Sequence, residues 1–144
     1  MRFWDSSAIV PLLVRQEATS KMEGEYRSGV PIAVWCLTGV EAWSAVCRLR
    51  REGRIGSPEV RVARSRLQGL TTTWVELDDW RSAAVRAQRL LELHPLRSAD
   101  ALQLAAALIL VAERPEKVPF VTLDEHLAGA AEREGFEIVG ALPA

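Results

Sequence analysis

The sequence predicts an α/β fold in which a central five-stranded parallel sheet is flanked by helices on both faces. Short apolar segments alternate with segments of helical period from one end of the chain to the other. Five such segments separated by helices favour a parallel sheet. No segment repeats with a period of about 20–50 residues, which excludes solenoid and propeller architectures.

The chain length predicts one domain spanning residues 1–144. A folded protein of this size exposes about 7,400 Å², against about 23,000 Å² for its unfolded chain. About two-thirds of the surface can therefore be buried, which is enough for one core but leaves little room for two.

The first half of the chain begins with strands expected at residues 2–4 and 31–35. Between them, Ser6 and Ser7 offer hydroxyl caps for a helix. Pro11 must lie in the first turn of that helix or kink it. A polar segment covers residues 18–27, and two further helices are expected over 38–51 and 57–70.

In the second half, strands are expected at residues 74–77, 119–123 and 136–139. Acidic residues 78–79 cap a helix that Pro95 ends, and Asp124 begins another that stops at Gly135. The helix that starts at Ser98 is apolar nearly all round, which predicts a central rather than a peripheral position.

Composition narrows the function classes. Hydrophobic residues make up 49% of the chain and charged residues 26%, which excludes disorder. The net charge of −1 favours no class of partner, so charge arguments must be local. Cys36 and Cys47 form neither a disulfide framework nor a zinc pattern and are expected to be buried free thiols. The most apolar run, 104–112, is far shorter than the ~20 residues of a membrane span, so a cytoplasmic protein without a membrane partner is expected.

Four carboxylates occupy strand ends or helix starts. Asp5 and Asp124 directly follow predicted strands, and Glu41 and Asp100 fall in the first turns of predicted helices. Because ligands of parallel α/β sheets bind beyond the carboxyl ends of the strands, all four could meet at one rim. Each acid also has a simpler explanation as a helix cap or as a partner of the helix dipole. Asp100 departs most clearly from that explanation, because it opens the most apolar helix.

Clustered carboxylates would repel one another unless a cation or raised pKa values relieved the repulsion. An all-oxygen donor set suits Mg²⁺ or Mn²⁺, whereas Zn²⁺ would require histidine or cysteine. Such a site suits phosphodiester hydrolysis. His94 and His126 are the only histidines, and His94 is expected on the surface at a helix end, so a serine–histidine or cysteine–histidine scheme lacks support.

The order of these motifs resembles that of PIN-domain nucleases, and the chain looks like a VapC-type toxin of a bacterial toxin–antitoxin pair. The resemblance covers nearly the whole chain and is most specific around Asp100. The four matching elements are the segments 5–8, 97–105 and 121–124, together with Glu41 in the helix after the second strand.

The resemblance implies a Mg²⁺-dependent endoribonuclease in which Mn²⁺ can substitute. Asp5 and Asp100 match metal ligands. Glu41 and Asp124 match the other two acids, which act directly or through water. Ser7 and Thr122 match hydroxyl positions that hold a carboxylate or water in place.

The same resemblance implies three partners. These are an RNA substrate, with tRNA and rRNA as candidates, a cognate VapB-type antitoxin, and a second copy of the chain in a homodimer.

Arginines supply 16 of the 18 basic residues, and residues 48–66 carry a net charge of +5. Arg48 and Arg51 in this stretch, and Arg97 just before Asp100, are candidates for contact with the substrate phosphates. A solvated helix-hairpin face is the simpler explanation of the stretch. Trp4, Trp35 and Trp74 lie in strand segments and are expected in the core, while Trp43 and Trp80 lie on helices and are candidates for exposure.

Two alternatives to the nuclease remain. A non-catalytic PIN scaffold would bind RNA or protein without cleaving it, but the intact acidic quartet weighs against this. A metal-dependent phosphatase or phosphotransfer receiver also places aspartates after strands. The lack of an Asp-x-Asp at Asp5 and of a lysine after a late strand weighs against that class.

Overall fold

The computed structural model describes residues 1–112 and 114–141, so the last three residues of the predicted domain lie outside the described part. Five strands form one sheet with the order β3-β2-β1-β4-β5, and every pair is parallel. The strands are β1 (Arg2–Trp4), β2 (Ile32–Trp35), β3 (Val75–Leu77), β4 (Phe120–Thr122) and β5 (Ile138–Gly140). The predicted five-stranded parallel sheet is confirmed, and the strands differ from the expected ranges only at their ends.

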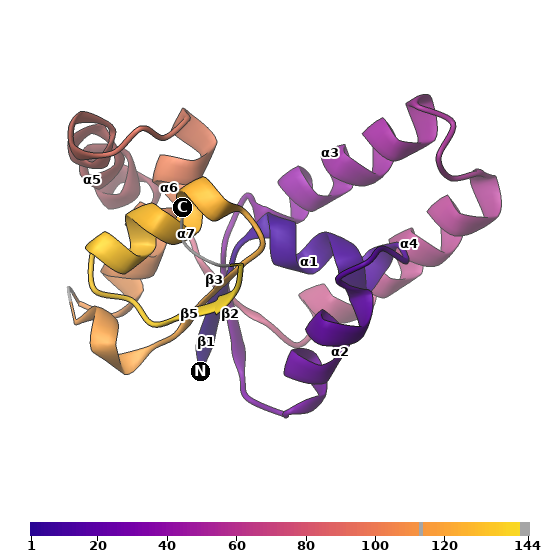
Figure 1. The fold of residues 1–144 in the computed structure, drawn as a ribbon, viewed down its shortest axis with the longest axis horizontal. Helices are drawn as coiled ribbons and strands as arrows, with labels where there is room; N and C mark the ends of the chain where they lie inside the picture. The colour runs from indigo at the N-terminus through magenta and orange to yellow at the C-terminus, as the bar shows by residue number, and fades with distance from the viewer. Residues whose placement is uncertain (113, 142–144) are drawn as a thin grey trace.

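Helices connect every pair of consecutive strands (Figure 1). The described residues contain α1 (Ser6–Leu13), α2 (Thr19–Arg27), α3 (Thr38–Arg51), α4 (Ser57–Thr71), α5 (Trp80–Leu93), α6 (Ser98–Leu110) and α7 (Glu125–Arg133), with a short 3₁₀ helix η1 (Pro115–Lys117). The polar segment predicted over 18–27 is therefore helical. None of the described helices combines the length and the apolar character that a membrane crossing needs.

The strands bury both of their faces, because successive side chains point to opposite sides of the sheet. Phe3 and Phe120 belong to a core shared with α5, α6 and α7. Trp4 and Val121, one residue further along, belong to a second core shared with α1 to α4. Figure 1 shows these two helical layers on either side of the sheet. Helix α6 is the central helix that its apolar sequence predicts, with seven of its residues buried.

The functional interest of this topology lies at the junction of β1 and β4. The chain runs from β1 outwards to β2 and β3, and then returns to pair β4 with the other edge of β1. The carboxyl ends of two strands that are far apart in the sequence therefore lie side by side, in the register Trp4↔Val121. The residues that follow them, beginning at Asp5 and at Leu123, start at a topological switch point.

Helix α1 begins one residue earlier than its serines predict. Asp5 is the N-cap residue, and its side chain accepts a hydrogen bond from the Ser7 backbone N–H. Pro11 lies in the second half of the helix rather than in its first turn, and it is buried there. The helix is short and apolar, and packing rather than propensity stabilises it.

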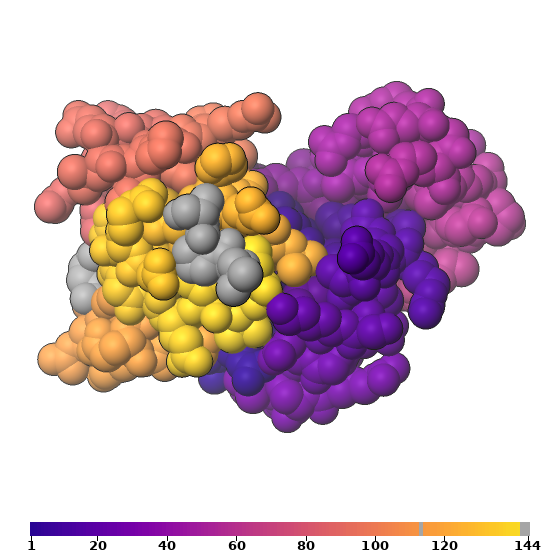
Figure 2. Space-filling model, viewed as in Figure 1, coloured from indigo at the N-terminus to yellow at the C-terminus, as the bar shows by residue number. Residues whose placement is uncertain are grey.

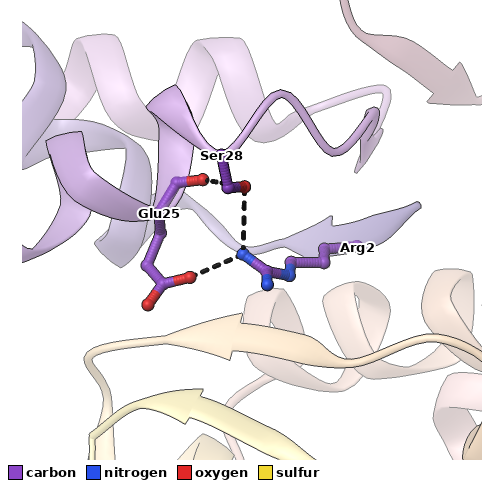
Figure 3. A network of polar contacts seen from close by, with 3 residues as sticks. All are labelled: Arg2, Glu25 and Ser28. Carbon is purple, nitrogen blue, oxygen red and sulfur yellow. Dashed lines mark hydrogen bonds and ion pairs between the residues drawn. The ribbon is translucent and has the colours of Figure 1, made fainter.

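An ion pair fixes the other end of β1. Arg2 Nη1 donates to Glu25 Oε2 and, over 3.4 Å, to the Ser28 hydroxyl (Figure 3). Both acceptors belong to the end of α2, so the amino end of β1 is tied to the helix that leads into β2.

Helices α3 and α4 form an antiparallel arm that projects from the sheet (Figure 1). Its inner side packs on α1 through buried Ala42, Val46 and Leu49. In Figure 2 the arm stands apart from the helices of the opposite layer, and the surface between them is hollowed along one edge.

Several sequence expectations need correction. His94 is not a surface residue: it is 9% exposed, and its Nε2 lies 2.7 Å from Glu134 Oε1 because the end of α7 covers it. Both cysteines are free, but they are only half-buried.

The tryptophans mostly lie where their segments predict. Trp4, Trp35 and Trp74 are buried, Trp80 is 61% exposed, and Trp43 is half-buried beneath the Arg64 guanidinium.

Two glycines provide opposite tests of the fold. Gly140 has φ +114°, and a Cβ there would lie 2.2 Å from the Thr122 carbonyl oxygen. We expect Gly140→Ala to lower the free energy of unfolding by about 2 kcal/mol or more. Gly24 lies inside α2, where an added methyl group would meet nothing within 4 Å. We therefore expect Gly24→Ala to raise the free energy of unfolding by about 0.5–1 kcal/mol. Urea denaturation of both variants measures these changes in the free energy of unfolding. Equal changes at Gly140 and Gly24 would contradict the close approach of Gly140 in β5 to Thr122 in β4.

Candidate active site

Asp5 is buried at the carboxyl end of β1. It is 2% exposed, and its backbone N–H donates to the Val121 carbonyl over 3.1 Å, which continues the ladder between β1 and β4. Its carboxylate accepts the Ser7 hydroxyl at 2.7 Å and the Ser7 backbone N–H at 3.3 Å. The carboxylate is thus held rigidly between the strand end and the first turn of α1.

Two hydroxyls connect this carboxylate to β4. Ser7 Oγ and Thr122 Oγ1 lie 3.2 Å apart and share a hydrogen bond. Ser7 Oγ also accepts the Leu123 N–H at 2.9 Å, and Thr122 Oγ1 accepts the Asp124 N–H at 3.1 Å. Both hydroxyls therefore hold backbone and carboxylate in place.

Burial raises the pKa of Asp5 from 3.8 to about 7. The hydrogen bonds from Ser7 and Thr122 oppose this shift, and the negative charge of Asp124 adds to it. Asp124 is the N-cap of α7, where its Oδ1 accepts the Leu127 N–H at 2.9 Å. Its capping role is therefore real, but its other oxygen accepts no hydrogen bond from the described residues.

Asp100 lies half-buried in the first turn of α6. Its pKa is raised, first by burial and then by the negative charges of Asp124 and Glu41. The positive charges of Arg97 and His126 act in the opposite direction. Asp124 therefore raises the pKa of both Asp5 and Asp100, so its negative charge acts on both of them.

Glu41 completes the acidic group from the first turn of α3. Its Oε2 accepts the Ser6 hydroxyl at 3.1 Å and the Gln103 side-chain amide at 3.0 Å. Gln103 is fully buried and also shares a hydrogen bond of 3.2 Å with the Thr38 hydroxyl. These contacts tie α3 to both α1 and α6, so Glu41 is oriented by three elements.

Gln103 and Ser6 are site residues that the sequence analysis missed. The signal for Gln103 was available, because it is a polar residue inside the most apolar helix and lies one turn after Asp100. A buried amide needs partners, and the carboxylate and hydroxyl supplied by α3 meet that need.

The predicted substrate arginines divide into two groups. Arg97 is exposed and lies within electrostatic reach of Asp100. Arg48 and Arg51 are exposed in the last turns of α3, seven and ten residues beyond Glu41. That separation is about 10 Å and 15 Å along the helix axis, so they lie outside the acidic group itself.

The donor chemistry of this group suits Mg²⁺ or Mn²⁺, because its carboxylates and hydroxyls all offer oxygen. In the part of the chain that the structure describes, no three His, Cys, Asp or Glu side chains are grouped so as to hold a metal ion. Mg²⁺ commonly binds through one or two carboxylates and keeps several waters. The negative charge of Asp124 acts on both Asp5 and Asp100, and a cation would relieve that repulsion, which fits this mode of binding.

Comparisons with known proteins show which solved structures share this fold. No protein-family model and no curated protein matches the chain. Among solved structures, the chain is similar to PAE2754 from Pyrobaculum aerophilum, with a TM-score of 0.66 and 21% identity over 96% of this chain and 88% of that chain.

Two further structures are similar over comparable lengths. FitAcB from Neisseria gonorrhoeae gives a TM-score of 0.65 at 15% identity over 96% of both chains. A toxin–antitoxin complex from Klebsiella pneumoniae gives 0.62 at 16% identity, over 90% of this chain and 92% of that chain. At these identities the likeness establishes a shared fold.

The raised pKa of Asp5 predicts a pH-dependent stability in the absence of metal. An acid whose pKa is higher in the folded state binds its proton more tightly when folded, so stability is lost as the pH rises from about 4 to about 7. We expect Asp5→Asn to remove this loss. In EDTA, the variant should gain stability over the wild type by an amount that grows to a few kcal/mol, about 4 at most, between pH 4 and 8.

Urea denaturation at several pH values measures that difference. The exposed Glu125 serves as the matched position, and Glu125→Gln should show a difference from the wild type that hardly changes with pH. A pH-independent difference for Asp5→Asn would contradict the assignment of a buried, proton-binding carboxylate.

The Gln103 contacts predict a second stability effect. Gln103→Met keeps the side-chain volume but leaves Thr38 and Glu41 without the amide, so we expect a loss of about 1–3 kcal/mol in unfolding free energy. Gln88→Met on the exposed side of α5 should change it by less than about 0.5 kcal/mol. Comparable losses in the two variants would show that the buried amide has no special role.

Proposed function

We propose that the protein is a PIN-type, Mg²⁺-dependent endoribonuclease. The observation that supports this most is that acids from four separate elements act on one another: Asp124 raises the pKa of both Asp5 and Asp100, and Glu41 raises that of Asp100. Asp5 follows β1, Asp124 follows β4, and Glu41 and Asp100 open α3 and α6. Neither capping nor the helix dipole requires these four positions to be electrostatically coupled, whereas a cation site does.

Asp5 and Asp100 are the proposed metal ligands, and Mn²⁺ would substitute for Mg²⁺. When bound, the ion would supply a Lewis acid that lowers the pKa of water and neutralises charge on the phosphate. A nearby cation favours the ionised form of Asp5, so the carboxylate would give up its proton when the site is loaded.

The other two acids have oxygens available for the water that attacks. Asp124 Oδ2 and Glu41 Oε1 accept no hydrogen bond from the described residues, since their partners bond to Oδ1 and Oε2. Each oxygen can orient a water molecule or accept its proton. Ser7 and Thr122 then keep Asp5 in position while its charge changes.

Arg97 is the proposed first contact for the scissile phosphate. An acidic site repels a phosphodiester, so a cation beside it must offset that charge. Arg97 lies three residues before Asp100 and is exposed, so its guanidinium can bind phosphate without leaving its helix end.

The biological role we propose is that of a growth-inhibiting toxin that a VapB-type antitoxin neutralises, with RNA such as tRNA or rRNA as its substrate and a homodimer as its assembly. The likeness to the fold of the Klebsiella pneumoniae toxin–antitoxin complex supports this role. The alternative is a non-catalytic scaffold of the same fold, which would bind RNA or protein in the absence of metal and release no fragments.

Cleavage of labelled RNA tests the proposal. We expect Mg²⁺-dependent fragments from the wild type that EDTA abolishes. Asp100→Asn should lower the rate at least about 100-fold, because it removes a ligand charge, while its circular dichroism spectrum stays native. Glu125→Gln, an acid-to-amide change on an exposed position of α7, should leave the rate within about twofold.

Full cleavage by Asp100→Asn would show that the acid has no role in the reaction. RNA binding that survives EDTA, with no fragments under any condition, would establish the scaffold instead.

A further inference from the structure

We propose that one face of α3 extends the acidic site into a binding track for the backbone of single-stranded RNA, formed by Ser44, Arg48 and Arg51. This inference rests on the proposed nuclease function and specifies where its substrate runs. It also separates Arg48 and Arg51 from Arg50, Arg64 and Arg66 of the basic stretch 48–66, whose side chains have partners within the protein.

The helical period places these residues on the same side as Glu41. Positions three, four and seven apart share one face of an α-helix, so Ser44 and Arg48 follow Glu41 along α3, and Arg51 follows Arg48. The opposite face, with buried Ala42, Val46 and Leu49, packs on the core, so the face that carries the arginines is open to solvent.

The neighbouring face of α3 is already occupied by α4. Arg50 donates to the Ser57 hydroxyl at 3.2 Å, and the Arg64 guanidinium lies 4.2 Å from the centre of the Trp43 ring. Arg66 donates to the Leu13 carbonyl at 3.4 Å. Arg50 and Arg64 hold the arm together, and Arg66 ties it to α1. Arg48 and Arg51 have no hydrogen-bond or ion-pair partner within residues 1–112 and 114–141.

The dimensions suit a polynucleotide. Arg48 lies about 10 Å and Arg51 about 15 Å from Glu41 along the helix axis, a span of roughly three to four stacked nucleotides. Because charges separated by more than about 8–10 Å are screened at physiological salt, each arginine must touch its own phosphate to contribute. Arginine suits such contacts, since its guanidinium binds phosphate oxygens in pairs. The open edge between the arm and the opposite layer in Figure 2 leaves a path for the strand.

Binding of a fluorescent, unstructured 12-nucleotide RNA tests the track. Anisotropy is measured in EDTA at several KCl concentrations for the full chain, its Arg48→Gln/Arg51→Gln variant, and a control in which the exposed Arg54 and Arg61 are both changed to Gln. The control removes the same charge from the same arm. Each lost phosphate contact should reduce the slope of log K against log salt by about 0.7, so the track variant should lose about 1.4 and the control less than about 0.5.

Length dependence checks the position of the track. A dinucleotide that binds at the acidic site is too short to reach Arg48 and Arg51, so its affinity should be the same for the wild type and the track variant. An equal loss for the dinucleotide and the 12-mer would overturn the proposed register along α3.

Two other results would also overturn the proposal. Equal slope changes in the track and control variants would mean that the arm acts through its overall charge. If the track variant keeps the wild-type salt slope for RNA but no longer binds an acidic decapeptide, this face of α3 binds a protein segment instead. The two proposals can also fail separately. If the salt slopes of the track and control variants differ but the protein cleaves no RNA, the track is supported and only the nuclease function is contradicted.

Discussion

The structure around the site depends on a buried carboxylate at the junction of two strands. Asp5 must lie where β1 ends, because its backbone N–H continues the ladder to Val121 while its side chain caps α1. Burial alone would make its negative charge costly, and its pKa of about 7 expresses that cost. The Ser7 and Thr122 hydroxyls offset part of it and join the two strand ends. A nearby cation would offset the remaining cost of the Asp5 charge. The buried carboxylate that destabilises the metal-free protein would therefore favour the metal-bound protein.

The other acids extend this arrangement rather than duplicate it. Asp124 caps α7 with one oxygen and acts electrostatically on both Asp5 and Asp100. Glu41, on α3, is fixed from two other helices through Ser6 of α1 and Gln103 of α6. Repulsion between the acids is tolerated because packing in the two cores fixes the elements that carry them. The same sheet edge therefore combines rigid positioning with unsatisfied charge, a combination that is common where proteins bind ions or carry out chemistry.

The sequence predicted the sheet and its strand-end acids well, because both follow from local signals. Asp5 and Asp124 come directly after apolar segments, and parallel strands bring such positions to one edge. Contacts that depend on how helices pack could not be predicted in this way. The amide of Gln103 meets Glu41 only because α6 brings it beside the first turn of α3, and His94 is buried only because the end of α7 covers it. The division of the arginines also needed the packed arm, since only the structure shows which face of α3 meets α4.

Calorimetric titration of the metal-free protein with Mn²⁺ tests the central claim most directly. Repeating it in buffers of different ionisation enthalpy at pH 6 counts the protons released. We expect the wild type to bind Mn²⁺ with release of most of one proton, since Asp5 is largely protonated at that pH. Asp5→Asn should bind at least about tenfold more weakly and release almost none. Equal affinity and equal proton release in the two proteins would contradict the account, because the buried carboxylate at the β1–β4 junction would then have no part in holding a cation.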